Sequence, residues 1–287
     1  MTKKTIWNVA ITLMIFLLGQ VISSVLLVVI GMLLSPGFKA AAIAYLSGSE
    51  QEVPLFDQIP VSFFALTLMA ANILTVLACY YLLRNIRLVT ASDFASIKWR
   101  PGMLGIAGGV LGAISMSVLT ENVELPDMMK QMSIAMSHNV WGLLALTIIG
   151  PITEELIFRE AIEGEMLRRG ATPWMAIIVS ALAFSAAHLN LAQSLYALPL
   201  GILFGIIYYK TGNIILAALL HILNNSIAAI QLHNMGENYE DTSYAGWLGS
   251  TSATYAIMAF CGVLCLVLTK FFWNYYCPSK ETKNSNT

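Results

Sequence analysis

Long apolar runs alternate with short polar stretches along the whole chain. Each run is close to the roughly 20 residues that an α-helix needs to cross a bilayer. Eight such runs can be marked, at 7–34, 61–83, 103–119, 141–167, 174–189, 195–209, 214–230 and 247–273. The pattern predicts an all-α polytopic membrane protein with about eight transmembrane helices. The whole chain, 1–287, is expected to form a single membrane domain, and residues 278–287 are expected to be a disordered tail.

Composition agrees with a membrane protein and excludes some other classes. The chain is 57% hydrophobic and 11% charged, with a mean hydropathy of +0.73. A soluble domain carries about 25% charged residues. No basic cluster is interleaved with aromatic residues, so nucleic-acid binding has no support. The four cysteines have no Cys-x-x-Cys spacing, so neither a disulfide framework nor a thiolate metal site is indicated.

The basic residues predict the orientation, because positively charged loops stay on the cytoplasmic side. If the N-terminus is inside and the chain crosses eight times, the outer side receives only Lys39 and Lys130. All other lysines and arginines then fall on the inner side. Both termini are therefore expected in the cytoplasm, and the first run is expected to be a retained span rather than a cleaved signal.

Glycines recur at four-residue spacing in two of the runs. They are Gly105, Gly108, Gly109 and Gly112 in the third run and Gly201 and Gly205 in the sixth. Small residues at this spacing let helix backbones approach closely. Close helix packing is therefore expected at both places, and the glycines need no other role.

The fourth run contains charged residues at bilayer depth. Glu154 and Glu155 follow an uncharged stretch from 141 to 149, and Arg159 comes four residues after Glu155. A charge at that depth costs at least a few kcal/mol, so such residues are usually paired and usually functional. Glu155 and Arg159 share a helix face and can neutralise each other, which leaves Glu154 without a partner. The further charges up to Arg169 indicate that the helix leaves the hydrocarbon there.

Two of the four histidines, His188 and His221, lie within apolar runs. Taken singly, a buried histidine more often binds a carbonyl group than takes part in catalysis. His221 has Asn225 at i+4, which puts an imidazole and a carboxamide on one helix face. Asn224 lies about 100° round the helix and fits either an interhelical hydrogen bond or a packing role. Phe184 shares a face with His188, where an ordinary core aromatic explains it.

These polar side chains come from the fourth, fifth and seventh runs and can serve three chemistries. A glutamate beside a histidine can deprotonate a water molecule, while the second histidine and the asparagine stabilise an oxyanion. Two histidines and a glutamate can instead hold a catalytic zinc ion. The same groups can also form a proton or ion relay in a transporter.

The spacing of these residues resembles the motifs of a known family. Glu154-Glu155-xxx-Arg159 resembles its EExxxR motif, Phe184-xxx-His188 its FxxxH motif, and His221-xxx-Asn225 its HxxxN motif, in the same order along the chain. The family is the CAAX-protease and bacteriocin-processing family of intramembrane glutamic endopeptidases, also called CPBP or Abi proteins. The Tyr-x-x-Thr-Gly-Asn stretch before the seventh run is similar too. The resemblance implies a peptidase core at about 139–230, on the fourth, fifth and seventh helices, with the first spans at 7–119 and the last at 247–273.

The resemblance implies an intramembrane endopeptidase. Glu154 would be the base that activates water, with His188 helping to hold that water. His221 and Asn225 would form the oxyanion site. The supporting residues that it implies are Glu155, Arg159 and Phe184.

No cofactor is favoured by this resemblance. Members of the family have been regarded as metalloproteases, and a zinc-dependent version would use Glu154, His188 and His221. An arginine and a carboxamide fit a zinc site less well than two histidines with a carboxylate and an outer acid. A metal-free glutamate mechanism is therefore expected.

The family includes proteases that cut prenylated C-terminal CAAX sequences. The resemblance therefore implies a peptide or lipidated-peptide substrate, contact with membrane lipid and a prokaryotic plasma membrane. Two other functions stay open. One is a catalytically inactive membrane immunity or scaffold protein, and the other is a transporter, although no inverted repeat of broken helices is visible.

The two intramembrane histidines come out at different depths. At 1.5 Å per residue, His221 lies about 13 Å past Gly212, whereas His188 lies about 24 Å past Thr172. Both runs are expected to begin on the cytoplasmic side. Either the link at 210–212 dips inward, or the fifth run begins outside the hydrocarbon, or the helices tilt strongly.

Overall fold

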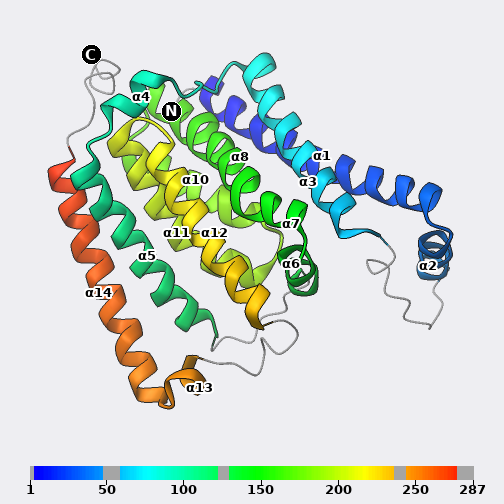
Figure 1. The fold of residues 1–287 in the computed structure, drawn as a ribbon. Coiled ribbons are helices and arrows are strands. Elements are labelled where there is room, and N and C mark those ends of the chain that lie inside the picture. The colour runs from blue at the N-terminus through cyan, green and yellow to red at the C-terminus, as the bar shows by residue number, and fades with distance from the viewer. Residues whose placement is uncertain (1–2, 48–58, 122–128, 236–243, 277–287) are drawn as a thin grey trace.

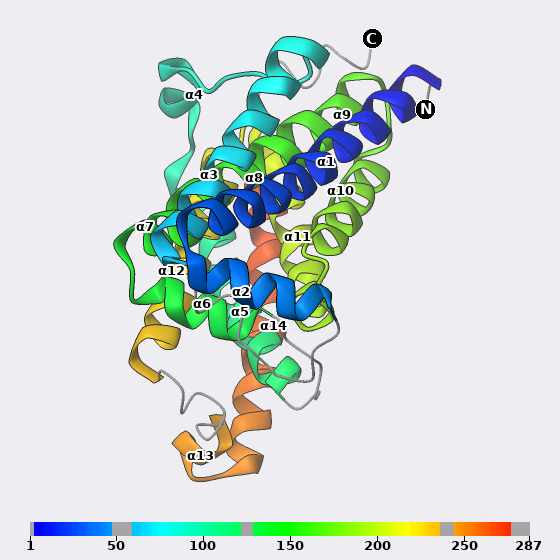
Figure 2. The ribbon, with the colours of Figure 1, turned by 90° about the vertical axis from the view of Figure 1, so that its right-hand side faces the viewer.

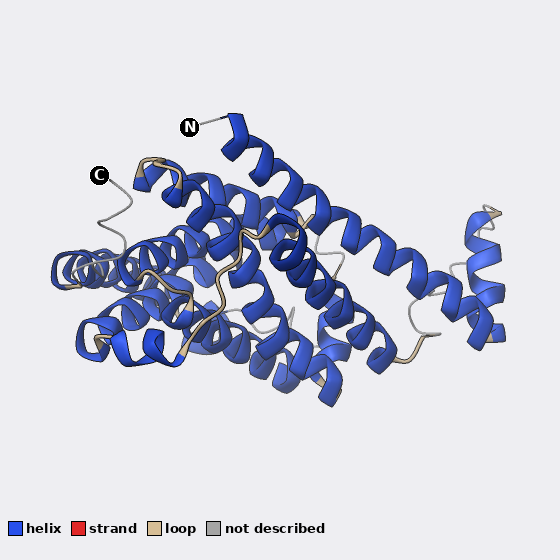
Figure 3. Cartoon of the chain, turned by 90° about the horizontal axis from the view of Figure 1, so that it is seen from above, coloured by secondary structure: helices blue, strands red, loops and turns tan. Residues whose placement is uncertain are grey.

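The computed structural model describes residues 3–47, 59–121, 129–235 and 244–276, and every regular element in these ranges is helical (Figure 1, Figure 3). The all-α prediction is confirmed, whereas the predicted disordered tail at 278–287 lies outside the described residues. The elements, with π-helical segments labelled η, are α1 Lys3–Leu34, α2 Pro36–Leu46, α3 Val61–Ala78, η2 Cys79–Leu83, α4 Ala91–Ser96, α5 Trp99–Glu121, α6 Lys130–Ser137, α7 Val140–Leu144, η3 Ala145–Ile149, α8 Gly150–Glu155, η4 Leu156–Gly164, α9 Glu165–Arg168, α10 Pro173–Ala187, α11 Leu191–Thr211, α12 Ile215–Met235, α13 Tyr244–Leu248 and α14 Thr251–Tyr275.

Seven helical segments in the described ranges are long and apolar enough to cross a membrane, as expected of an integral membrane protein. They correspond to seven of the eight predicted runs. The exception is α10, which has 15 residues and is shorter than an ordinary span. The start of α1 and the end of α14 lie at the same end of the bundle (Figure 1), as an even number of crossings requires. This arrangement agrees with eight crossings when α10 is included, and the count of eight stays a prediction.

The glycine-rich helices pack closely against their neighbours. Helix α5 packs along α14, and α10 packs against α11. A Cβ atom added to Gly105 of α5 would lie 3.1 Å from the ring of Phe272 on α14. A Cβ atom added to Gly201 of α11 would lie 3.3 Å from Cα of Ala181 on α10. The predicted role of these glycines in close helix packing is confirmed.

Helix α1 lies beside α3 on one face of the bundle (Figure 2). Its N-terminal half also contacts the helix that carries the two adjacent glutamates. The ring of Phe16 meets that of Phe158 edge-on, with the centroids 5.4 Å apart, and Nδ2 of Asn8 donates to Oε1 of Glu165 at 2.6 Å. Helix α1 therefore covers one side of the motif helix.

The link between α11 and α12 lies inside the protein. Lys210, Thr211 and Asn213 are buried, whereas Thr172, just before α10, is exposed. Helix α12 therefore begins in the protein interior, while α10 begins at the protein surface. The burial of the link is compatible with an inward dip, and the three explanations for the depths of the two histidines stay open.

The charged residues at the end of the motif helix are mostly enclosed by protein. Glu160, Glu163 and Glu165 are 2%, 0% and 5% exposed. Nη1 of Arg168 donates to Oε1 of Glu160, and Nε of Arg169 donates to Oε1 of Glu165. The sequence pattern, which indicated an exit from the hydrocarbon here, did not predict that these carboxyl groups are buried.

Candidate active site

One imidazole ring lies between two carboxyl groups of the motif helix. Nδ1 of His221, on α12, is 3.0 Å from Oε1 of Glu155, and Nε2 of the same ring is 3.7 Å from Oε2 of Glu154. His221 and Glu155 are buried, whereas the side chain of Glu154 is 25% exposed. Because an ionised carboxylate only accepts hydrogen bonds, Nδ1 carries a proton and donates to Glu155. The structure thus brings together side chains from the fourth and seventh predicted runs.

The Glu155 carboxylate also holds Arg159, one turn further along. Nε of Arg159 donates to Oε2 of Glu155 at 3.1 Å, and Nη1 donates to Oγ of Ser180 on α10 at 2.8 Å. Ser180 in turn donates to the carbonyl oxygen of Phe158 at 2.7 Å. The ion pair expected from the i, i+4 spacing is present. Ser180 is a supporting residue that sequence reasoning missed, since a single serine in an apolar run carries no signal.

Two phenylalanine rings enclose the buried arginine and histidine. Cζ of Arg159 lies 5.2 Å from the ring centroid of Phe184 and 5.8 Å from that of Phe204. The ring of His221 stacks on Phe204 at 4.8 Å and meets Phe184 edge-on at 5.6 Å. Attraction between a cation and an aromatic face reaches about 2 kcal/mol when the cation is desolvated. Phe184 therefore does more than fill the core, and Phe204 is a second such residue that the sequence did not indicate.

The helix that carries the glutamates contains two π-helical segments. It is continuous from Val140 to Arg168, with π-helical turns at η3 and η4 on either side of α8. A π-helical turn has wider i→i+5 hydrogen bonding and is often found at functional sites. Glu154 and Glu155 lie at the end of the short α-helical part between the two segments.

Pro151 explains why a main-chain carbonyl of this helix is available to another helix. In η3 the N–H of Gly150 donates to the carbonyl of Ala145, five residues back. The next bond of this kind would join residue 151 to Leu146, but proline has no N–H. The Leu146 carbonyl instead accepts a hydrogen bond of 3.0 Å from Nδ2 of Asn225. The proline thereby allows Asn225 to bind the motif helix.

The two adjacent asparagines of α12 have different partners. Oδ1 of Asn224 accepts a hydrogen bond from the hydroxyl of Tyr196 on α11 at 2.7 Å, so the predicted interhelical bond is confirmed. Nδ2 of Asn224 donates to Oδ1 of Asn225 at 3.1 Å. A carboxamide has two N–H donors, and Leu146 accepts one of those of Asn225. The orientation of the Asn225 carboxamide is therefore fixed by hydrogen bonds at both Oδ1 and Nδ2.

His188 directly follows α10 and is half-buried. Its Nδ1 is 2.9 Å from the carbonyl oxygen of Phe184, and its ring meets the Phe184 ring edge-on at 4.9 Å. Since the carbonyl accepts, Nδ1 carries a proton, and in the neutral ring this leaves the lone pair at Nε2. Among the described residues, no hydrogen bond or ion pair joins His188 to Glu154 or His221. The ring of Phe184 contacts the rings of both His188 and His221.

The residues suggested for zinc do not fit a metal site in this arrangement. Within the described ranges, no three His, Cys, Asp or Glu side chains lie close enough together to hold one ion. The set Glu154, His188 and His221 is therefore not assembled around a common point.

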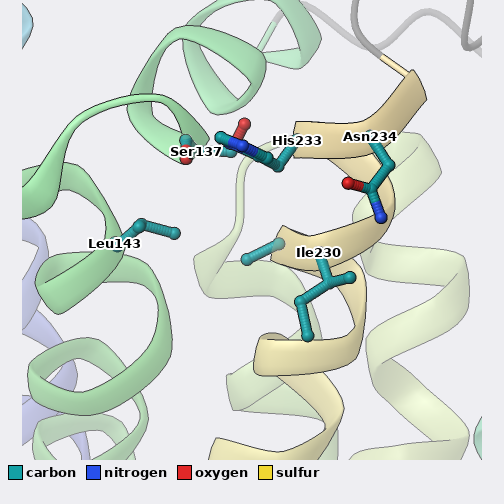
Figure 4. A pocket seen from close by; sticks show the side chains of 6 residues that line it. Ser137, Leu143, Ile230, His233 and Asn234 are labelled. Carbon is teal, nitrogen blue, oxygen red and sulfur yellow. Dashed lines mark hydrogen bonds between the residues drawn. The ribbon is translucent and has the colours of Figure 1, made fainter.

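A separate cavity lies at the far end of α12. It has a volume of about 250 Å³ and is lined by Ser137, Leu143, Ala229, Ile230, His233 and Asn234 (Figure 4). Nδ1 of His233 is 3.0 Å from the carbonyl oxygen of Ser137, and its ring lies 4.3 Å from that of His138. His233 lies about 18 Å further along the helix than His221, so this cavity is not part of the site around Glu154.

Comparisons with known proteins match part of the chain. Residues 136–227 match the model of a family described as "Type II CAAX prenyl endopeptidase Rce1-like". A protein of Bacillus subtilis (strain 168) named "Putative membrane peptidase YdiL" is 28% identical over 97 residues, which cover 34% of this chain and 39% of that protein. No solved structure matches the chain. Residues 136–227 contain the three motifs, and the resemblance of this chain to the CAAX-protease and bacteriocin-processing family is therefore confirmed.

Proposed function

We propose that this protein is an intramembrane endopeptidase in which Glu154 activates a water molecule for attack on a peptide bond. The similarity of residues 136–227 to a CAAX prenyl endopeptidase family and the similarity of the chain to a protein named as a putative membrane peptidase support peptidase activity. The observation that carries the mechanism is the His221 ring, with Glu155 at Nδ1 and Glu154 at Nε2. A general base must be reached by water and substrate, and Glu154 is the partly exposed carboxylate of the two.

In the proposed reaction, Glu154 accepts a proton from water, and the oxygen of that water attacks the carbonyl carbon of the scissile bond. The former carbonyl oxygen becomes an oxyanion. Glu154 then gives the proton to the leaving nitrogen as the C–N bond breaks, so the enzyme neither gains nor loses a proton. His188, with its lone pair at Nε2, helps to hold the attacking water.

The oxyanion is stabilised by His221 and Asn225 in this proposal. Because Nδ1 of His221 donates to Glu155, Nε2 can donate only when the ring is an imidazolium cation. Glu155 is the counter-charge of this cation throughout, and Glu154 is a second one until it accepts the proton from water. Asn225 supplies a second N–H. Removing one donor from an oxyanion site typically lowers kcat about 10²- to 10³-fold.

The substrate in this proposal is a peptide, in particular a lipidated one, that reaches the site from the membrane. The description of the matching family as a prenyl endopeptidase supports this substrate class. The distribution of lysine and arginine supports a cytoplasmic location of both termini. A prokaryotic plasma membrane is the proposed location.

Glu154→Gln tests the proposal. The full-length protein in lipid nanodiscs is given fluorogenic CAAX peptides with and without a prenyl group on the cysteine. Wild type is expected to cleave the prenylated peptide, and Glu154→Gln to lose at least about 10²-fold in kcat. Glu165→Gln, on the same helix but paired with Asn8 and Arg169, is the control and should keep the wild-type rate.

Cellular peptides provide a test that does not depend on the chosen reporter. Mass spectrometry is expected to find peptides that accumulate when wild type is replaced by Glu154→Gln. Full turnover by this variant would refute the role of Glu154. A biological effect that this variant retains in full would favour the immunity or scaffold function instead.

A further inference from the structure

One buried carboxyl group next to the site has no part in the proposed reaction. Glu163 lies one turn after Arg159 on the same helix and is fully buried. Within the described ranges, neither of its side-chain oxygens has a hydrogen-bond partner. The closest approach between the two charged groups is 3.8 Å, from Nη1 of Arg159 to Oε2 of Glu163. That distance is too long for a direct hydrogen bond.

Arg159 has a donor that is unused in the same way. Its Nε donates to Glu155 and its Nη1 donates to Ser180, whereas Nη2 is buried and has no partner among the groups that the structure describes. Buried polar atoms are nearly always bonded to protein or to ordered water. The guanidinium of Arg159 thus has one unused donor, and the carboxyl group that lies 3.8 Å from its Nη1 has two unused acceptors, all of them buried.

The polar groups around Glu163 have other partners. The hydroxyl of Tyr208, on α11, donates to Oε2 of Glu160 at 2.8 Å. On the side facing α11, a Cβ atom added to Gly205 would lie 2.9 Å from Oε2 of Glu163 and 3.1 Å from Cγ2 of Ile177. Glycine at position 205 therefore leaves the space that the carboxyl group needs.

We propose that Glu163 and Nη2 of Arg159 bind one internal water molecule, and that Glu163 is thereby a positioning residue for the active site. Nη2–H donates to the water oxygen, and the water donates to a carboxyl oxygen of Glu163. This bridge holds the guanidinium plane so that Nε faces Glu155, which in turn holds the ring of His221. Only the kinetic consequence rests on the proposed peptidase function.

A counter-ion with a purely structural role would behave differently. If Glu163 only balanced the charge of Arg159, every neutral substitution would lower Tm. With a water bridge, leucine at position 163 removes a buried polar group that has no protein hydrogen bond. Leucine also leaves the buried Nη2 of Arg159 without a partner, and an unsatisfied buried donor is destabilising. Glu163→Leu should therefore lower both Tm and kcat, whereas Glu163→Gln, which can still bind the water, should lower neither.

The test compares Glu163→Leu, Glu163→Gln and the control Glu165→Leu in the full-length protein in nanodiscs. Glu163→Gln keeps a polar group that can bind the water and should stay close to the wild-type kcat. Glu163→Leu should lower kcat at least about 10-fold, as loss of an orienting residue typically does, with KM unchanged and Tm lowered. Glu165 accepts hydrogen bonds from Asn8 and Arg169, so Glu165→Leu should lower Tm and leave kcat unchanged.

A high-resolution structure of each variant supplies a readout that is independent of activity. A water molecule within about 3.2 Å of both Nη2 of Arg159 and a Glu163 oxygen, present in wild type and absent in Glu163→Leu, would support the proposal. A direct bond between these two side chains would overturn it. A wild-type kcat in Glu163→Leu would also overturn it. So would losses of Tm and kcat that are equal in Glu163→Leu and Glu163→Gln. If wild type cleaves no peptide, the peptidase proposal fails, whereas the water density still decides this one.

Discussion

Nδ1 of His221 donates a hydrogen bond of 3.0 Å to Oε1 of Glu155, a residue 66 positions earlier in the chain. The other oxygen of that carboxylate accepts from Nε of Arg159 at 3.1 Å. One carboxylate therefore fixes both the proton position on the imidazole and the place of a buried cation. The proposed chemistry of the ring depends on a residue that has no need to touch the substrate.

Glu155→Gln should impair both activity and stability. The glutamine oxygen can still accept from His221, but Arg159 loses the negative charge that is hydrogen-bonded to it. A buried charge that loses its partner destabilises by about 3–5 kcal/mol, and we expect kcat to fall about 10- to 100-fold. Steady-state kinetics and thermal unfolding in nanodiscs measure the two effects. A variant with wild-type kcat would contradict the orienting role.

Pro151→Ala should uncouple Asn225 from the motif helix. The substitution restores an N–H at position 151, which can then donate to the Leu146 carbonyl in place of Asn225. Asn225→Ala alone should lower the free energy of unfolding by about 1–3 kcal/mol, because it leaves that carbonyl without its donor. In the Pro151→Ala background the loss should be smaller.

Unfolding of wild type, both single variants and the double variant measures this coupling. We expect an interaction energy of at least about 0.5 kcal/mol, as found for residues that share a partner. Strictly additive losses would show that Pro151 and Asn225 act independently.

Gly109→Ala should disturb the contact between α5 and α12 near the site. An added Cβ atom would clash with Cδ2 of Leu220, the residue before His221, and would lie 2.9 Å from Cδ1 of the same side chain. Overpacking of this kind costs about 1–3 kcal/mol, and we expect a lower Tm together with a lower kcat. Leu220→Ala makes room for the new methyl group, so the double variant should be more stable than the sum of the single effects indicates. Additivity would argue against a direct clash.

Asp93 should make the short helix α4 sensitive to acid. Burial raises the pKa of Asp93, but the hydrogen bonds from the side chain and N–H of Thr90 and the charge of Arg87 outweigh it, so the pKa lies below its ordinary value of 3.8. Because the folded-state pKa is the lower one, the ionised group stabilises the helix above pH 3.8. This contribution is lost as the pH falls through the folded-state pKa.

Hydrogen exchange of residues 91–96 as a function of pH measures this effect. Wild type should show faster exchange at acid pH, after correction for the intrinsic exchange rate. Asp93→Asn should exchange faster than wild type at neutral pH and lack the acid-dependent step. An unchanged pH dependence in this variant would exclude Asp93 as the titrating group.

Peptidase activity should survive removal of metal ions. No group of three suitable ligands is assembled in the part of the chain that the structure describes. Activity after treatment with EDTA or 1,10-phenanthroline, together with elemental analysis of the purified protein, measures this. Activity that is lost on chelation and restored by stoichiometric zinc would contradict the metal-free mechanism.

Residue spacing predicted which side chains pair within one helix. It did not predict which side chains make contacts between helices. The apolar runs gave the all-α class, and the i, i+4 rule gave the Glu155–Arg159 pair. Ser180 and Phe204 were missed, because their roles exist only through contacts with the motif helix. The contact between Asn225 and Leu146 could not be predicted either, since it depends on a π-helical turn before Pro151 rather than on any periodicity.

The length of α10 shows the same limit of periodicity. The apolar pattern continues to residue 189, but the helix ends at Ala187. Nδ1 of His188 bonds to the carbonyl of Phe184, and Leu189 has a positive φ of 50° that an α-helix does not accommodate. Side-chain chemistry at the end of the helix, rather than hydrophobicity, therefore decides where it stops.

The shortness of α10 has a consequence for the lipids around it. A helix of 15 residues is about 22 Å long, whereas the hydrocarbon layer of a typical bilayer is about 30 Å thick. With α10 as the predicted eighth crossing, the lipids beside it are expected to compress, at a fraction of a kcal/mol for each ångström of mismatch. Turnover should therefore rise in vesicles of short-chain phospholipids and fall in thicker ones, so that the acyl-chain length of the host membrane becomes a determinant of the rate.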